Sequence, residues 1–360
     1  MESVASAGSW VRRLALWPGE GLLYRRFGWF SGGLLVLLGL NELSLWGGDV
    51  RRWDWLFVTG ILAFLMALRP SLALPDKMHE TLDRLGTGKV LSGPEDLQAF
   101  ERNLHRSSRW AALVGGAVTV PVIAVAWIAA RGLVGRYLGT MTAEVVAAVP
   151  VGLCFGRTVG YGLLGRRLTR SRFTVTVDPE HLDGATGLRP VGDFYFFQAM
   201  LLAVPAVFLG AWWVAIPFYG ERYEGWRDAY VALLAIVLVC ELLAFLLPLW
   251  SFHIVMKEEK RRLLAEADEI GHQALEVQRQ LRSEPKETQL KHLEDRLARL
   301  TRRYQAIEKM PTWPVSTRVR RRLALNNVIL LTPVVAQILG APDSLQHLLD
   351  ALQKVITGHA

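Results

Sequence analysis

The chain has 360 residues, of which 51% are hydrophobic, and its apolar residues are gathered into long runs that a single globular core does not require. The formal net charge of +8 comes largely from basic residues beside these runs, so it does not indicate nucleic-acid binding. Both cysteines, Cys154 and Cys240, fall inside apolar runs, which excludes a disulfide framework and a zinc cluster.

Six apolar runs are long enough to cross a bilayer, because a hydrocarbon core of about 30 Å needs about 20 helical residues. They lie at residues 29–46, 54–69, 110–130, 141–165, 195–216 and 229–252. We therefore predict an all-α membrane protein with a six-helix transmembrane domain over residues 29–252. Residues 1–28 combine tryptophan and leucine with paired arginines, and they are predicted to lie in the cytoplasmic interface.

Lys and Arg alternate between high and low numbers along the connecting segments. The first 28 residues hold four, the connection after the second run seven and the loop after the fourth five, whereas each of the other three loops holds two. Positively charged short loops stay on the cytoplasmic side, so both the N-terminal and the C-terminal regions are predicted to be cytoplasmic. The connection over residues 70–109 is broken by prolines and glycines and is predicted as a small loop, in which 95–109 could form a helix.

The fourth run carries small side chains at every fourth position, namely Ala148, Gly152, Gly156 and Gly160. This spacing forms a smooth ridge along a helix, which lets another backbone approach closely. Two interpretations remain open. The ridge serves helix packing within one subunit, or it forms a subunit contact or a pore-lining helix.

Two ionisable residues fall inside the predicted spans, Arg157 in the fourth and Glu241 in the sixth. Counted at about 1.5 Å per residue, they lie at depths of roughly 12 and 16 Å, so they could meet if these spans are neighbours. A charge in a bilayer is costly unless it is paired or hydrated. We therefore expect an intramembrane polar pair, either as a structural ion pair or as an ion-conducting or gating site.

The most distinctive loop lies between the fourth and fifth spans, within residues 166–194. Residues 173–177 alternate like a short strand, and the glycines and prolines that follow predict tight turns. Carboxylate and imidazole ligands are offered by Asp178, His181, Asp183 and Asp193. These side chains are candidates for a cation site, for which the metal is unknown. The alternative is a rigid turn that caps helices and fixes the start of the fifth span.

The run HLDGATGLRPVG, residues 181–192, resembles the His-x-Asp-Gly-Ala-x-Gly-Leu signature in a connecting loop of poorly characterised bacterial multi-pass membrane proteins. The resemblance covers this loop, and the rest of the chain follows only the general plan of spans plus a helical tail. It implies a bacterial inner-membrane protein. It implies no established activity, and it assigns no functional residue in this chain.

Residues 253–310 have interleaved charges, with apolar residues at alternating steps of three and four on either side of Pro285. This pattern predicts two helices of coiled-coil type that form a cytoplasmic hairpin, or a kinked stalk shared between subunits. Residues 311–360 are predicted to return to the membrane as an apolar and amphipathic segment. Within it, the apolar run at 323–340 contains asparagines and a glutamine, which favour an interfacial or re-entrant helix over a seventh crossing.

No motif for catalysis or cofactor binding is found, so neither an enzyme nor a bound cofactor is expected. The leading hypothesis is a homo-oligomeric channel-like or signal-transducing protein, in which the cytoplasmic hairpin couples a stimulus to the six-span bundle. The alternative is a membrane anchor or scaffold that recruits a cytoplasmic protein through residues 257–309 and transports nothing. Both hypotheses imply contact with membrane lipids, and neither involves nucleic acid.

Overall fold

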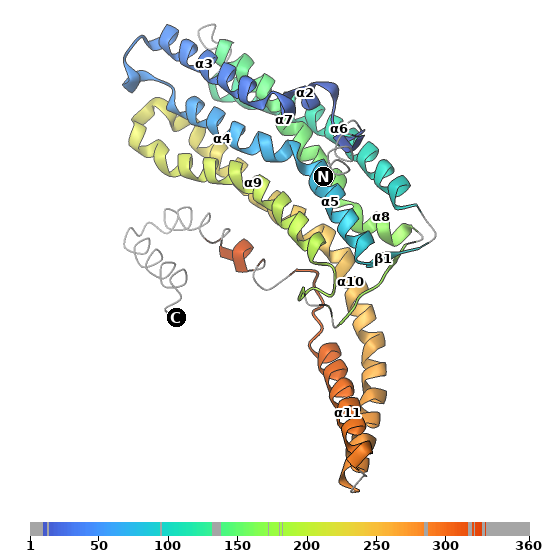
Figure 1. Ribbon diagram of the computed structural model, residues 1–360. Helices are drawn as coiled ribbons and strands as arrows, with labels where there is room; N and C mark the ends of the chain where they lie inside the picture. Colours follow the sequence, from blue (N-terminus) through green and yellow to red (C-terminus); the bar gives the residue numbers. More distant parts are fainter. Residues whose placement is uncertain are drawn as a thin grey trace.

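The structure is a computed structural model that describes residues 10–12, 14–93, 96–131, 138–171, 173–179, 181, 183–283, 287–315, 319, 321–325 and 328. It is helical along most of its length (Figure 1). The predicted interfacial or re-entrant helix at 323–340 lies outside the described residues except at 323–325 and 328, and residues 341–360 lie outside them as well.

The elements follow one another with short connections. The helices are α2 (Pro18–Arg25), α3 (Phe27–Trp46), α4 (Trp55–Leu72), α5 (Leu74–Thr87), α6 (Leu97–Arg131), α7 (Leu138–Gly162), α8 (Leu164–Arg170), α9 (Arg189–Ala215), α10 (Arg227–Arg282) and α11 (Glu287–Glu308). Between them lie the 3-10 helices η1 (Val50–Arg52) and η3 (Ile216–Trp226) and the strands β1 (Leu91–Ser92) and β2 (Thr174–Val175).

Six helical segments are long and apolar enough to cross a membrane, and each overlaps one of the six predicted spans. They are Phe27–Trp46, Trp55–Thr87, Leu97–Ile128, Gly139–Leu168, Arg189–Tyr219 and Arg222–Arg282. Large apolar side chains remain exposed along them, as in Trp29 at 86% and Leu247 at 62%, which suits a lipid environment. The predicted all-α architecture, with six helices long and apolar enough to span a membrane, is therefore confirmed.

The bundle is built around α4, α7, α9 and α10, with α6 packed on α7 and α3 along one edge (Figure 1). α10 begins in the bundle and continues well beyond it, and α11 lies back along its distal part. We call the end of the bundle from which α10 leaves the hairpin end. α10 beyond residue 256, together with α11, is called the helical hairpin.

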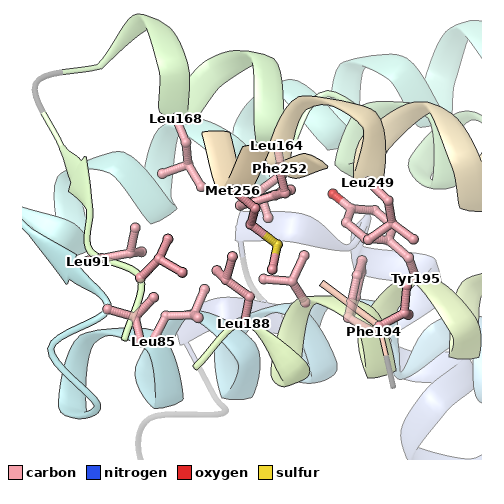
Figure 2. Close-up of a cluster of buried hydrophobic side chains, with 14 of the residues drawn as sticks. Leu85, Leu91, Leu164, Leu168, Leu188, Phe194, Tyr195, Leu249, Phe252 and Met256 are labelled. Atoms are coloured by element: carbon pink, nitrogen blue, oxygen red, sulfur yellow. The ribbon is translucent and has the colours of Figure 1, made fainter. Parts of the chain in front are cut away.

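A large buried apolar cluster fills the hairpin end (Figure 2). α5 contributes one face of regularly spaced side chains, Leu74, Met78, Leu82 and Leu85, all of them fully buried. Leu188 before α9 and Met256 of α10 meet them from other directions (Figure 2). Burying a side chain of this size stabilises a fold by about 1.5–3 kcal/mol. The cluster therefore holds α5, the loop before α9 and α10 in one packed unit.

α5 corrects the prediction of a loop over residues 70–109. Pro75 stands in the first turn of the helix, where its missing N–H costs nothing, so it begins α5 and does not break it. The helix ends in a turn in which the Val90 N–H donates to the Leu85 carbonyl and Lys89 takes a left-handed conformation, with φ 53°. β1 then pairs antiparallel with β2, which is the short strand predicted after the fourth span.

Candidate functional site at the hairpin end

The small-residue ridge of α7 consists of Ala148, Gly152, Gly156 and Gly160. Its glycines pack inside the chain against α6, and Ala148 is buried. A Cβ added at Gly152 would lie 2.6 Å from the carbonyl oxygen of Gly115, and one at Gly156 would lie 2.1 Å from that of Ala111. The two backbones are in direct contact, as small-residue ridges allow. Of the two interpretations of the ridge, the structure supports helix packing within one subunit.

Arg157 of α7 makes a buried ion pair with Glu20 of α2. Its Nη2 lies 2.8 and 2.7 Å from the two carboxylate oxygens of Glu20, and the two side chains are 1% and 7% exposed. The prediction that Arg157 pairs with Glu241 is therefore wrong, and Glu20 takes that place. The sequence predicted residues 1–28 to lie in the interface, whereas α2 packs into the bundle. Glu241 is fully buried in α10 and has interactions of its own.

The N-terminal segment, residues 10–25, fastens three helices together, and we call it the N-terminal clasp. Arg12 pairs with Asp76 of α5 at 2.9 Å. The guanidinium of Arg109 in α6 lies 3.9 Å from the centre of the Trp17 ring, in a cation–π contact. The third contact is the buried ion pair with α7 described above. The clasp is thus an integral part of the bundle.

A chain of polar side chains runs beneath the clasp, and we call it the histidine network. Nδ1 of His79 lies 2.7 Å from Oε1 of Glu101, and Nε2 of His105 lies 3.1 Å from the same oxygen. Nδ1 of His105 lies 2.8 Å from the hydroxyl of Tyr161. His79 is partly exposed, whereas the other three are buried, and the Trp10 ring lies edge-on to both histidines. The network therefore leads from the surface of α5 through α6 to the interior of α7.

The contacts of His105 fix its tautomer when the imidazole is neutral. A neutral imidazole donates from one nitrogen and accepts at the other. Because the Glu101 carboxylate accepts from Nε2, Nδ1 accepts the hydrogen bond of the Tyr161 hydroxyl. The network therefore links α5, α6 and α7 through one continuous set of polar contacts.

Sequence reasoning missed the histidine network. Glu101 and His105 stand four residues apart and so share one helix face, which was the local signal available. Their partners come from α5 and α7, and no spacing in the sequence places them together. His79 belongs to no motif for catalysis or metal binding in the sequence.

Asp183 organises the loop before α9. Its carboxylate accepts hydrogen bonds from the backbone N–H groups of Ala185, Gly187 and Arg189 at 2.8–3.2 Å and lies 3.1 Å from Nδ1 of His181. Partial burial raises the pKa of this carboxyl, but the three hydrogen bonds and the charge of His181 outweigh burial and hold the pKa below its ordinary value. Asp183 is therefore ionised at neutral pH and ties the loop to the first turn of α9.

Of the other candidate cation ligands, His181 lies beside Asp183, whereas Asp193 is paired elsewhere. Asp193 pairs with Arg189 on the surface of α9 at 3.4 Å, and the backbone carbonyl of Asp178 accepts the His181 N–H at 3.2 Å. In the part of the chain that the structure describes, no group of three or more His, Cys, Asp or Glu is placed to hold a metal ion. The geometry thus favours the rigid turn over the cation site.

α11 lies antiparallel against α10, and its end is capped by a lysine. Arg303 of α11 pairs with Glu266 of α10 at 2.6 Å. Lys260 of α10 donates to the carbonyl oxygens of Glu308 and Met310, at 3.1 and 2.8 Å. The last carbonyl groups of a helix lack partners within it, so this ammonium satisfies and stabilises the end of α11.

The segment after α11 docks on the bundle at what we call the hairpin root. The indole of Trp313 stacks on the imidazole of His253 with ring centroids 4.5 Å apart, and Nδ1 of His253 lies 2.6 Å from the carbonyl oxygen of Thr312. The carbonyl of Pro314 lies so close to Gly192 of α9 that a Cβ added there would be 2.3 Å away. The chain therefore returns from the hairpin to the bundle at this point.

Comparison of the chain with protein-family models, with curated proteins and with solved structures finds no match. The functional proposal consequently depends on the geometry of the clasp, the histidine network and the hairpin root.

Proposed function

We propose that this chain is a multi-pass protein of a bacterial inner membrane that acts as a homo-oligomeric channel-like or signal-transducing protein. In this proposal the helical hairpin is cytoplasmic, receives a stimulus or a partner, and passes its movement to the bundle. The observation that carries the proposal is α10, because Arg227–Arg282 forms one helix that is both the last span and the first arm of the hairpin.

A continuous helix transmits movement because its two ends cannot turn independently. α10 contains Pro248, which removes a backbone hydrogen bond and makes this position the natural place for the helix to bend. The Pro248 ring lies next to α7, where a Cβ added at Gly162 would be 3.6 Å from it. A tilt of the hairpin would therefore displace α7, which also carries Arg157 and Tyr161. Because these two residues contact the clasp and the histidine network, hairpin movement would also displace those groups.

The homo-oligomer in this proposal needs a surface other than the ridge of α7, since α6 already covers that ridge. α3 offers one, because nothing lies within 4 Å of a Cβ added at Gly28 or Gly32, and these two glycines have the spacing of a close helix contact. We expect Gly32→Leu to lower the oligomer mass measured by native mass spectrometry. Gly33→Leu, on the adjacent face of the same helix, serves as the control.

Flux into proteoliposomes and planar-bilayer recordings on purified protein test the proposal. Gly192→Ala should push the Pro314 carbonyl away and loosen the hairpin root, so conductance or its response to a stimulus should change. Gly271→Ala in the hairpin, where the added Cβ meets only Tyr304 at 3.8 Å, should leave both unchanged. Absence of conductance under any stimulus, together with a monomeric mass, would remove the channel version. Equal behaviour of the two variants would remove coupling through the root.

A scaffold without transport activity is the second candidate function. Apolar side chains remain exposed on the hairpin, with Leu264 at 44%, Leu275 at 55% and Leu290 at 38%, and they could contact a partner helix. One comparison of two variants in cells distinguishes the two functions. If Leu275→Asp abolishes the activity of the protein in cells and Glu241→Gln does not, the scaffold is favoured. If Glu241→Gln abolishes it while assembly and folding survive, the scaffold is excluded.

A further inference from the structure

A hollow of about 310 Å³ lies at the base of the helical hairpin, between α11 and the loop before α9. One wall consists of Arg302, Gln305 and Ala306 of α11 and of Lys309 in the turn just after it, and their spacing places them on one side of the helix. Ala306, the smallest of the four, lies in the middle, which leaves room between the longer side chains. The volume falls at the lower end of the range of about 300–1,000 Å³ that small-ligand sites occupy.

The charge of this hollow is positive. Arg302 and Lys309 stand at its two ends, and no carboxylate side chain lines it within the described part of the chain. Neither cation has a salt-bridge partner among the described residues, whereas their neighbours Arg262 and Arg303 are paired with glutamates. The adjoining hollow, on the α10 side of the loop, is lined by charges of both signs and lacks this excess.

The opposite wall of the hollow is held in a rare backbone conformation. Thr186 has φ 56°, in the left-handed region that a β-branched residue seldom enters. Such conformations persist where the surrounding structure enforces them, and they cluster at ligand sites. Thr186 and His181 both line the hollow. The Thr186 hydroxyl donates to the carbonyl of Ala185, so the turn presents the imidazole of His181 opposite the two cations.

We propose that this hollow binds a phosphate group, held by the guanidinium of Arg302 and the ammonium of Lys309. The planar fork of a guanidinium matches phosphate oxygens, and an ammonium adds a compact second charge, so the pair suits a dianion better than a single carboxylate. Gln305 and His181 supply further hydrogen-bonding groups on the two walls. The proposal goes beyond the proposed function, since binding is measured directly and requires no transport or signalling.

Two sources of phosphate can reach the hollow. Its lining ends at Met310 and Pro311, just before Trp313 docks on the bundle, so an anionic lipid headgroup lies within reach. Its other side faces solvent, which admits free phosphate. The experiment therefore has two arms, both with the full chain in nanodiscs. Calorimetry with inorganic phosphate is done in phosphatidylcholine discs, and native mass spectrometry counts the phosphatidylglycerol retained from mixed discs.

The double variant Arg302→Gln with Lys309→Gln is expected to weaken binding at least tenfold. The double variant Arg296→Gln with Arg299→Gln removes the same charge from α11 outside the hollow and should bind as the wild type does. Loss of phosphate binding in the first variant alone identifies free phosphate. Loss of retained phosphatidylglycerol in the first variant alone identifies the lipid headgroup. If neither ligand distinguishes the two variants, the proposal is overturned.

A second variant separates a shaped site from general attraction to positive charge. Ala306→Leu fills the middle of the hollow without altering any charge, and it should also weaken binding at least tenfold. Ala298→Leu, on an exposed part of the same helix, is the matched control. Binding that survives Ala306→Leu but falls with ionic strength would show only diffuse attraction, and would equally overturn the proposal.

Discussion

The buried ion pair between Glu20 and Arg157 gives the sharpest prediction about stability. Glu20→Gln keeps an amide oxygen for the Trp17 N–H that Glu20 caps, and it removes only the charge facing Arg157. Arg157→Met removes the other charge and replaces the arginine with an unbranched apolar side chain. The double variant removes both, so no isolated charge remains buried at the clasp.

The magnitude follows from burial. With side chains 1% and 7% exposed, solvent screens the pair little, and removing one partner of such a pair costs about 3–5 kcal/mol. Two further donors of Arg157, Nε and Nη1, are buried without a hydrogen-bond partner within the described residues, so Glu20 supplies its principal compensation. The double variant should cost clearly less than Glu20→Gln alone, with a coupling energy of at least about 2 kcal/mol.

Reversible unfolding in detergent gives the free energies for this cycle, and hydrogen exchange of the α2 amides reports opening of the clasp. Glu20→Gln should speed that exchange, because releasing the clasp lets water reach Arg157. If the free-energy costs of the two single substitutions sum to that of the double variant within about 0.5 kcal/mol, the reasoning is refuted, because substitutions at independent sites are additive within that margin.

Three other predictions concern packing, the histidine network and the loop. Gly156→Val should destabilise the bundle by about 3 kcal/mol, because its side chain would overlap the α6 backbone, whereas Gly39→Val, in open space, should cost little in thermal unfolding. Tyr161→Phe should cost about 1–3 kcal/mol in the same assay, because the buried Nδ1 of His105 loses its donor; an unchanged midpoint would contradict the assigned hydrogen bond. Since the pKa of Asp183 is lower in the folded chain than in the unfolded one, its stabilisation is complete above about pH 3.9 and is lost as the pH falls through the folded value. The protection of the loop amides, measured relative to an unstructured peptide at the same pH, should therefore fall in acid, and Asp183→Asn should remove that dependence; acid-insensitive protection in the wild type would contradict it.

The sequence predicted those features that depend on local pattern. The six spans follow from the length of the apolar runs, and the strand of residues 174–175 follows from alternation. α5 was missed although its apolar residues recur at helical spacing, because Pro75 and the glycines near its end were interpreted as breaks. Proline at the first turn and glycine after the last one mark the ends of a helix equally well.

The candidate site was only partly predictable, because its contacts join segments far apart in the chain. The ridge of α7 was found from spacing alone, but which helix covers it was not. Arg157 was identified as a buried charge from its place in an apolar run. Its partner, Glu20, lies 137 residues away in a segment whose composition predicts an interfacial position. The histidine network likewise needs three helices, and it was missed, because the spacing of Glu101 and His105 was the only local signal of it in the sequence.

Transmission from the hairpin to the bundle requires that the part of α10 beyond Pro248 remain one stiff arm in lipid, and a distance measurement tests this most directly. Spin labels at Val159→Cys and Leu275→Cys, with Cys154 and Cys240 replaced by alanine, sit at exposed positions on α7 and on the hairpin. Because Gly162 of α7 lies beside Pro248 of α10, Val159 stands at a level about 30 residues before Leu275 on the α10 axis. At a rise of about 1.5 Å per residue the two labels are about 45 Å apart. In nanodiscs the account predicts a single narrow distance distribution near that value, which broadens in Gly192→Ala. A broad distribution in the wild type would contradict it.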